Sequence, residues 1–341
     1  MARLPLDTLR RPVASLYSIW MSAEIASTIS SQTPKGPLLI RLCNWVGEAV
    51  LSLPALHRLA AAGYDLQLYG KTWAPALFEG TGWPVMVRSA SLNTTTENLR
   101  ALRRKLGAAK PPPALLMTNS FSSALEARLG GFSPSGYANE GRSWLLRHAY
   151  RQQTVTHAAH SYWNLANRFL GLDEPFPATL GWTPSESQRA QAQALLARHQ
   201  VTPRFFAILC PFSGPDDQAN QKVWPHFGEL ASALQAAGID LVLCPGPGEE
   251  QAAAALRANA VILPNVDLGV YGALFLLARC VVANDTGPGH LAAAAGARLI
   301  SIYGPHSVSA WTPIGPNVRL FHDLAKWPSV ESIAAAVLAT I

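Results

Sequence analysis

The sequence has no long apolar run. No stretch of its 341 residues approaches the roughly 20 consecutive apolar residues that a membrane-spanning helix needs. A few basic residues stand at the N-terminus, but Glu24 interrupts the apolar part, so residues 1–34 do not have the compact layout of a signal peptide. We interpret residues 1–34 as a partly helical extension that packs on the body of the protein. Contact with a membrane surface is the alternative that stays open.

Cysteine is scarce, and its placement argues against a metal site. The four cysteines, at positions 43, 210, 244 and 280, are too far apart for metal-ligand spacing. Each lies inside or beside an apolar run of the kind that forms a buried strand. We interpret them as buried, reduced thiols, which are typical of a cytoplasmic protein, and predict no metal site.

Features of nucleic-acid-binding proteins are missing as well. The pI is about 9.3 and the net charge is +6, yet the sequence has no basic–aromatic stripe and no recognisable DNA- or RNA-binding motif. The positive charge is also unevenly placed. Residues 1–180 contain 18 basic and 10 acidic residues, whereas residues 181–341 contain 9 and 11. Nucleic acid is therefore not an expected partner, and the basic surplus belongs to the first half.

The sequence does contain many apolar residues, in a regular pattern. Hydrophobic residues make up 49% of the chain and charged residues 14%, which suffices for the cores of two domains. Short apolar runs alternate with helical stretches, which implies right-handed βαβ crossovers and parallel sheets. The alternation loosens after about residue 120 and restarts after "DEPFPATLGWTPSES" at 173–187. The predicted fold class is therefore α/β, with two doubly wound, Rossmann-like units.

We place the domain limits at this interruption. The prediction is an N-terminal extension at 1–34, a first domain at 35–180 and a second at 181–341. A closing helix at 329–341 is expected to pack near the hinge or against the first domain. Ligands bind open parallel sheets at the carboxyl ends of the strands, so the site should lie in a cleft between the two domains.

The segment "ANDTGPGH" at 283–290 follows an apolar strand and leads into an Ala-rich helix expected to start at about His290. Gly287 and Gly289 let the backbone approach a ligand closely, and the free N–H groups of the helix start suit a diphosphate. A carboxylate repels phosphate, so Asp285 is expected to orient the loop or hold a cation. A plain helix cap with two turn glycines is the alternative.

Three stretches together resemble the bacterial heptosyltransferases of lipopolysaccharide core assembly, glycosyltransferase family 9. The C-terminal stretch "NDTGPGHLAAAAGARLISIYGP" is similar to the family's longest signature. The stretches "LLIRLCNWVGEAVLSLPALHRL" and "CPFSGPDDQANQKVWPHFGELASAL" resemble its first strand–turn–helix and its Lys-x-Trp-Pro element. The resemblance covers about residues 37–341. It implies the GT-B fold, a nucleotide sugar on the second domain, an acceptor on the first, and no catalytic metal.

The resemblance also assigns candidate binding residues. The nucleotide-sugar-binding candidates are Lys222, Glu250, Asp285, Thr286, Gly287, Gly289 and His290, with Glu249 as the alternative to Glu250 for the ribose. The acceptor-binding candidates are Asn44, Trp45, Gly47, Arg104 and Arg147. The two arginines belong to the basic surplus of the first half, which suits an anionic acceptor. A solvated helix face is the other interpretation of these charges.

Glu48 is the candidate catalytic residue and departs from the family. Members usually carry Asp after the glycine of the first turn, as the presumed base, whereas this chain reads "NWVGEAV". Glutamate can take a proton from an acceptor hydroxyl equally well, with one more methylene group to place. An acid favoured by the helix dipole is the alternative role.

The function implied is inverting transfer of a heptose from ADP-heptose to an anionic, lipid-linked lipopolysaccharide core acceptor. The expected location is the cytoplasm, with the inner face of the inner membrane as a peripheral site. Two alternatives stay open: a GT-B transferase with another nucleotide sugar or acceptor, and a nucleotide-sugar-binding module that has lost its base. Product formation separates the module from the enzymes.

Overall fold

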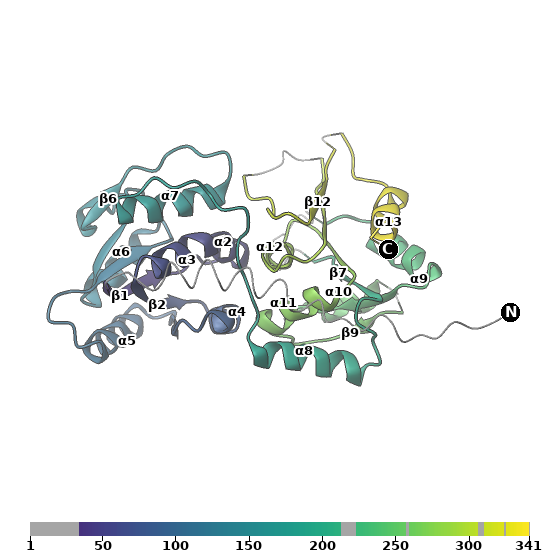
Figure 1. The fold of residues 1–341 in the computed structure, drawn as a ribbon, viewed down its shortest axis with the longest axis horizontal. Helices are drawn as coiled ribbons and strands as arrows, with labels where there is room; N and C mark the ends of the chain where they lie inside the picture. Colours follow the sequence, from purple (N-terminus) through teal and green to yellow (C-terminus); the bar gives the residue numbers. More distant parts are fainter. Residues whose placement is uncertain (1–33, 213–222, 257–258, 306–309, 324, 341) are drawn as a thin grey trace.

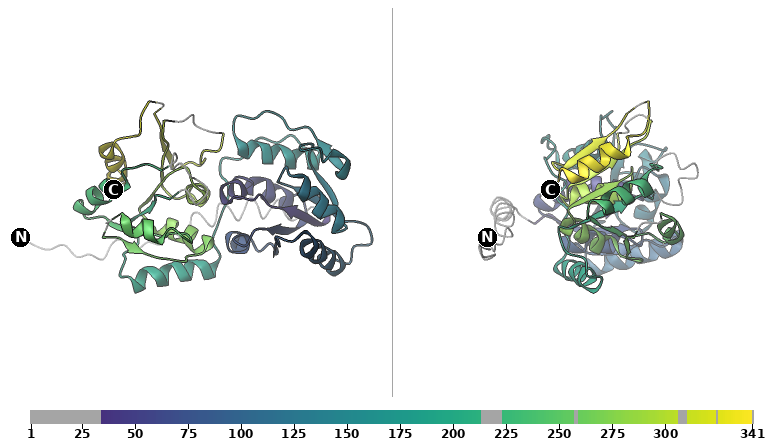
Figure 2. Two further views of the ribbon diagram at one scale, coloured as in Figure 1. Left: turned by 180° about the vertical axis from the view of Figure 1, so that it is seen from behind. Right: turned by 90° about the vertical axis from the view of Figure 1, so that its right-hand side faces the viewer.

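The computed structural model describes residues 34–212, 223–256, 259–305, 310–323 and 325–340. Two six-stranded parallel sheets lie side by side along the long axis, each with helices packed on it (Figure 1). Seen from behind, the two sheets keep this arrangement (Figure 2). The predicted α/β class with two doubly wound units is confirmed.

The first sheet has the strand order β3-β2-β1-β4-β5-β6. Its strands are β1 Gly36–Arg41, β2 Tyr64–Gly70, β3 Val85–Val87, β4 Pro113–Leu116, β5 Ser133–Tyr137 and β6 His148–Tyr150. Its helices are α2 Val46–Leu51, α3 Leu53–Ala61, α4 Ala74–Phe78, α5 Leu92–Lys105, α6 Phe121–Leu129 and α7 Ala158–Leu170, with 3-10 turns η1 Glu79–Thr81 and η2 Ser143–Leu145. Strand order reverses between β1 and β4, which opens a crevice at their carboxyl ends.

The second sheet repeats this design, with the order β12-β11-β10-β7-β8-β9. Its strands are β7 Phe206–Cys210, β8 Asp240–Leu243, β9 Val261–Ile262, β10 Cys280–Ala283, β11 Leu299–Ile302 and β12 Val318–Phe321. Its helices are α8 Glu186–Arg198, α9 Phe227–Ala236, α10 Glu250–Ala255, α11 Leu268–Leu277, α12 Gly287–Ala294 and α13 Val330–Leu338. Here the order reverses between β7 and β10.

The central strands are apolar on both faces because helices cover both sides of each sheet. In β1, the side chains of Leu38, Leu39 and Ile40 have no exposed surface, and β7 is buried along its whole length. Uninterrupted apolar runs of this kind are typical of parallel sheets. The cysteines are unpaired; three are buried and Cys244 is half-buried.

Trp182 joins the two halves of the molecule. It lies in the chain between α7 and α8, and its Nε1 donates to the carbonyl of Leu77 in α4, 2.7 Å away. Its ring packs on Gly272 of α11, where an added Cβ would come within 2.3 Å of the ring. One continuous apolar core consequently includes residues of both sheets. The domain limits given above stay a prediction.

Two details differ from the sequence-based expectations. Helix α13 packs against α9 and β11 of the second half, so the prediction that it packs near the hinge or on the first domain is wrong (Figure 1). Its Ile333 and Val337 are fully buried in that core, which fixes its position. Helix α12 begins at Gly287, three residues before the expected start, because Thr286 caps it.

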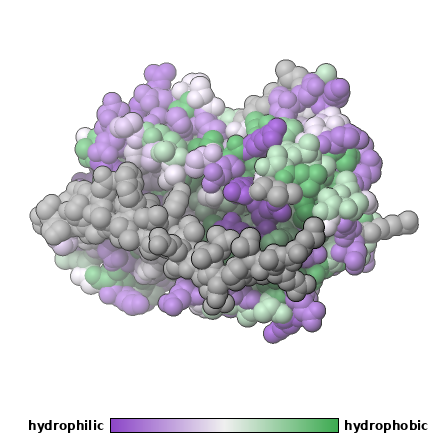
Figure 3. Space-filling view, turned by 45° about the vertical axis from the view of Figure 1, so that its right-hand side comes forward, coloured by the Kyte–Doolittle hydropathy of each residue, from purple (hydrophilic) through white to green (hydrophobic). Residues whose placement is uncertain are grey.

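No helix among the described residues is both long and apolar enough to cross a membrane. On the face drawn in Figure 3, hydrophobic residues form patches among hydrophilic ones.

Candidate functional site

A cavity of about 410 Å³ lies at the carboxyl ends of the first sheet. Its first-domain wall includes Asn44, Trp45 and Glu48 from the turn after β1, and Asn119 from the turn after β4. Ala310 and Trp311 of the second half complete it. The cavity therefore lies at the point where strand order reverses, and both halves of the chain line it.

Glu48 lies half-buried in the first turn of α2 and faces this cavity. Burial raises the pKa of its carboxyl group, because the charged form loses solvation. Hydrogen bonding from the backbone at Trp45 and Asn44 and the charge of Lys71 oppose that rise in pKa. The carboxyl group is thus partly shielded from water yet open to a ligand, as a general base requires.

Amide and hydroxyl side chains of the first domain also line the cavity. Gln152 accepts at Oε1 from Nδ2 of Asn139 at 2.6 Å and from Nδ2 of Asn119 at 3.5 Å. Its Nε2 donates to Oγ of Ser161 at 3.0 Å. We call the lining residues Asn119, Gln152 and Ser161 the amide wall, and Asn139 supports it from outside the cavity lining. Neutral donors and acceptors at this density match the hydroxyl groups of a saccharide.

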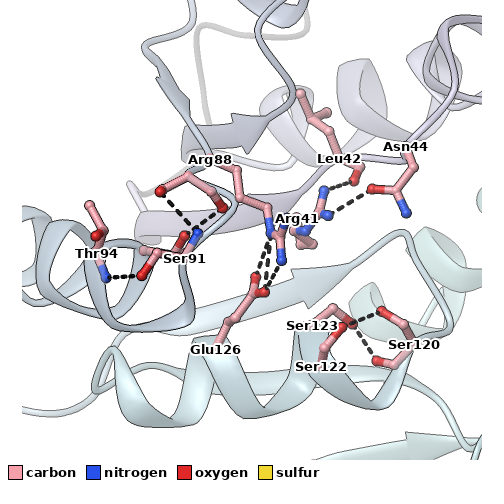
Figure 4. A network of polar contacts seen from close by, with 12 residues as sticks. Arg41, Leu42, Asn44, Arg88, Ser91, Thr94, Ser120, Ser122, Ser123 and Glu126 are labelled. Carbon is pink, nitrogen blue, oxygen red and sulfur yellow. Dashed lines mark hydrogen bonds and ion pairs between the residues drawn. The ribbon is translucent and has the colours of Figure 1, made fainter.

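A buried guanidinium orients Asn44 from behind. Arg41, at the end of β1, donates from Nη2 to Oδ1 of Asn44 at 2.8 Å and from Nη1 to the carbonyl of Leu42 (Figure 4). Next to it, Arg88 pairs with the buried carboxylate of Glu126 from α6. Burial lowers the pKa of Arg41, and the nearby charge of Glu126 opposes this. The network fixes the Asn44 amide at the cavity edge.

In the second half, the chain after β10 carries the predicted diphosphate loop. Oγ1 of Thr286 accepts from the N–H of Gly289 at 3.5 Å and caps α12. The hydroxyl of Tyr303 donates to Oδ1 of Asp285 at 3.0 Å. Burial and the charge of Asp285 both raise the pKa of Tyr303, so its hydroxyl keeps its proton and orients that carboxylate. The loop is therefore held by its own Thr286 and by Tyr303, which follows β11.

Asn284, which the sequence analysis missed, holds three segments together. Its side chain has no exposed surface. Its Oδ1 accepts from the N–H of Trp224 at 3.0 Å, and its Nδ2 donates to the carbonyl of Pro211 at 2.6 Å. Asn284 thereby ties the chain after β10 to the chain after β7 and to the segment that precedes α9. These three segments lie where the strand order of the second sheet reverses. The sequence does carry a signal for this role, because Asn284 is a polar residue between the apolar run of β10 and Asp285.

The turn after β1 and the turn after β10 are in contact across the two halves of the chain. A Cβ added to Gly47 would lie 2.6 Å from Cδ2 of His290, and one added to Gly287 would lie 3.2 Å from Cβ of Val46. The starts of α2 and α12 are therefore in contact, and Glu48 lies one residue from that contact. The structure brings the predicted base and the predicted diphosphate loop together.

The model of glycosyltransferase family 9 (heptosyltransferase) matches residues 99–334. The chain belongs to glycosyltransferase family 9. It is 27% identical over 328 residues to lipopolysaccharide heptosyltransferase 2 of Escherichia coli K12, covering 86% of this chain and 90% of that protein.

Solved structures agree with the fold of this family 9 transferase. That of the E. coli ADP-heptose lps heptosyltransferase II superposes with a TM-score of 0.74 at 20% identity, covering 89% of this chain and 98% of the other. A family 9 glycosyl transferase from Veillonella parvula gives 0.78 at 17% identity, with 91% and 98% covered. The GT-B arrangement is confirmed.

Two predicted acceptor residues of the transferase do not reach the cavity. Arg104 lies in the last turn of α5 and lines a separate hollow of about 610 Å³ with Arg100 and Arg103. Arg147 precedes β6, and its N–H donates to the carbonyl of Pro134 near the start of β5. The end of a helix that leads into a strand lies at the amino edge of a parallel sheet, and so does the start of a strand. Arg104 and Arg147 therefore lie at the amino edge, whereas the cavity lies at the carboxyl edge. The assignment of these two arginines to the acceptor site is not supported.

Of the remaining candidates for the nucleotide sugar, the structure describes Glu249 and Glu250. Oε2 of Glu249 accepts from the N–H of Gly246 at 2.8 Å, and Oε2 of Glu250 accepts from the N–H of Gly248 at 3.0 Å. Glu249 is half-buried, whereas Glu250 is exposed. Glu249 is thus the more shielded of the two carboxylates after β8. Lys222 lies outside the described residues.

Lys71 was missed as a neighbour of the base. It follows β2, and its Nζ lies 5.0 Å from the ring centroid of Trp45, a cation–π contact. A lysine after a strand has no distinctive sequence pattern, so only the fold brings it near Glu48. Among the described residues, no set of three or more His, Cys, Asp or Glu side chains could hold a metal ion.

Proposed function

We propose that this transferase moves a heptose from ADP-heptose to a saccharide acceptor of the lipopolysaccharide core, with inversion at the anomeric carbon. The observation that carries the proposal is the position of Glu48. Its carboxylate faces a cavity with an amide wall and lies beside the contact between Gly47 and His290. The names of the E. coli relatives supply the donor and the acceptor class.

The donor is assigned to the second domain. The N–H groups at the start of α12, which follow Thr286 and include Gly287 and Gly289, suit the diphosphate. Asp285 orients this loop through its bond with Tyr303, and His290 lies where the donor and acceptor sides meet. Glu250, or Glu249 as its alternative, takes the ribose hydroxyls, and Lys222 supplies a positive charge to the phosphates. No resident cofactor or metal is included.

The acceptor hydroxyl enters from the first domain. Asn44 and Trp45 contact the acceptor beside Glu48. Glu48 takes the hydroxyl proton while the oxygen attacks the anomeric carbon from the face opposite the diphosphate. The bond from that carbon to the phosphate oxygen breaks, and its electron pair leaves with ADP. The raised pKa of Glu48 strengthens it as a base.

The acceptor is lipid-linked, so the reaction belongs at the cytoplasmic face of the inner membrane. The support for this location is the acceptor class, since residues 1–33 lie outside the described part of the chain. Flotation of the full chain with phosphatidylglycerol vesicles, compared with a chain lacking residues 1–33, tests whether the extension contributes.

The decisive experiment measures product. The protein is incubated with ADP-heptose, and separately with ADP-glucose, UDP-glucose and GDP-mannose, in the presence of heptose-deficient core oligosaccharide. We expect a heptosylated product only with ADP-heptose, and none with Glu48→Gln. Glu97→Gln, an exposed acid of α5, is the matched control that keeps activity. Transfer from another nucleotide sugar alone would replace the substrate assignment, and nucleotide binding without any product would favour the binding module.

A further inference from the structure

Two exposed aromatic rings contact each other next to Ser120, a residue that lines the cavity. Phe121 begins α6, and Trp144 lies in η2; their ring centroids are 6.0 Å apart and their planes are inclined by 52°. Phe121 is 37% exposed and Trp144 72%. Large aromatic side chains usually bury most of their surface, so an adjoining exposed pair indicates a binding surface.

The aromatic pair is continuous with the cavity. Ser120, which directly precedes Phe121, lines the cavity, and so does Glu140. Oε2 of Glu140 accepts from the backbone N–H of Phe121 at 3.2 Å. Glu140 has a φ of 51°, an uncommon backbone conformation for a residue other than glycine. Ser120 and Glu140 therefore link the cavity lining to the start of α6, which carries Phe121.

A buried arginine braces the two segments that carry the rings. Arg142 donates from Nη1 to the carbonyl of Ser120 at 3.1 Å and to Oγ of Ser123 at 3.0 Å. Its Nε donates to the carbonyl of Tyr137 at 3.0 Å. Burial lowers its pKa to about 10, so the guanidinium stays charged at neutral pH. The start of α6 and the chain before η2 are thus tied together, which fixes the backbone positions of the two rings relative to each other.

We propose that Phe121 and Trp144 form a second saccharide subsite, which binds the acceptor ring one unit beyond the sugar that reacts at Glu48. Aromatic faces pack against the C–H faces of sugar rings, while the amide wall of the cavity takes hydroxyl groups. The identity of the acceptor as a saccharide rests on the proposed function. The subsite implies in addition that the enzyme recognises at least two sugar units of that acceptor.

The test compares acceptors that differ in length. Soluble, deacylated core oligosaccharides with and without the additional sugar unit are titrated by calorimetry into the wild type and into the double variant Phe121→Ala, Trp144→Ala. We expect the double variant to bind the longer oligosaccharide about tenfold more weakly and the shorter one unchanged. In transfer assays the KM for the longer acceptor rises while kcat stays constant.

Two further variants separate stacking from general damage. The pair Phe121→Tyr, Trp144→Phe keeps both rings and should retain the affinity for the longer oligosaccharide. Phe205→Ala removes a ring that is 63% exposed just before β7, far from the cavity, and should change neither affinity. Equal losses for both oligosaccharides, or no loss, would overturn the subsite.

The outcomes distinguish this inference from the proposed function and from a membrane role. Length-dependent binding without any transfer would remove the enzyme function and leave the subsite standing. Transfer that is indifferent to the aromatic pair would do the reverse. If the double variant stops binding phosphatidylglycerol vesicles but keeps its oligosaccharide affinity, the rings contact lipid and the subsite is wrong.

Discussion

The imidazole of His290 lies directly against the backbone of Gly47, so closely that a Cβ at position 47 would come within 2.6 Å of its Cδ2. One residue belongs to the second sheet's α12 and the other to the first sheet's α2. The two helix starts can approach this closely only because position 47 has no side chain. The separation of base and donor loop is therefore set by a glycine.

We expect Gly47→Ala to lower kcat/KM by about 10²-fold, because a displacement of about 1 Å between reacting groups has that effect. Affinity for ADP alone should change little, since the nucleotide binds the second domain. Steady-state kinetics and calorimetry measure the two effects. Gly228→Ala in α9, where the nearest atom is 3.5 Å from the added Cβ, is the control. A fully active Gly47→Ala enzyme would show that the contact does not matter.

Glu48→Gln should cut turnover by about 10²–10⁴-fold and leave nucleotide affinity intact. It should also raise the melting temperature at neutral pH. The folded-state pKa of Glu48 is raised, so the folded protein favours the neutral carboxyl group. The resulting destabilisation is absent below the unfolded pKa of about 4.3 and grows as pH rises through the folded value. Thermal melts of both proteins should thus agree at pH 4 and diverge by pH 7; the opposite trend would contradict the raised pKa.

Lys71→Met should move the acidic limb of the pH profile of kcat/KM to higher pH. The charge of Lys71 lowers the pKa of Glu48, so without it the base stays protonated to a higher pH. Lys71→Arg keeps the charge and should restore the wild-type profile. A limb that stays in place in Lys71→Met would mean that Glu48 is not the titrating base.

Tyr303→Phe should weaken ADP binding about tenfold, because Asp285 loses the hydrogen bond that orients it. Tyr64→Phe, in the first sheet, removes a hydroxyl far from this loop and serves as the control. Isothermal calorimetry with ADP gives both dissociation constants. If Tyr303→Phe and Tyr64→Phe bind ADP equally well, the bond between Tyr303 and Asp285 does not organise the donor loop.

Asn284→Ala should lower the free energy of unfolding by about 2–3 kcal/mol, since the N–H of Trp224 and the carbonyl of Pro211 lose their buried partner. Urea denaturation measures the change. Asn317→Ala, whose exposed amide donates to the carbonyl of Gly296, should cost less than about 1 kcal/mol. Similar losses in the two variants would contradict the special role of Asn284.

The order of residues along the chain predicts the alternation of strand and helix, and with it the two doubly wound sheets. Local patterns suffice for this, because apolar runs and helical periodicity are properties of neighbouring residues. The same locality placed Glu48 after β1 and Asp285 after β10, both at carboxyl ends where parallel sheets bind ligands.

Which other residues join Glu48 and Asp285 at the site depends on how the chain folds. The assignment of Arg104 and Arg147 to the acceptor site depends on their charge. Charge carries no information on the sheet edge where a residue lies, and both arginines lie at the amino edge. Gln152 and Asn139 come from irregular chain between β5 and α7 and meet Asn119 only through folding. The packing of α13 on α9 and the contact of His290 with Gly47 likewise join residues far apart in the chain. Such contacts depend on the shapes of two assembled surfaces, which no local pattern encodes.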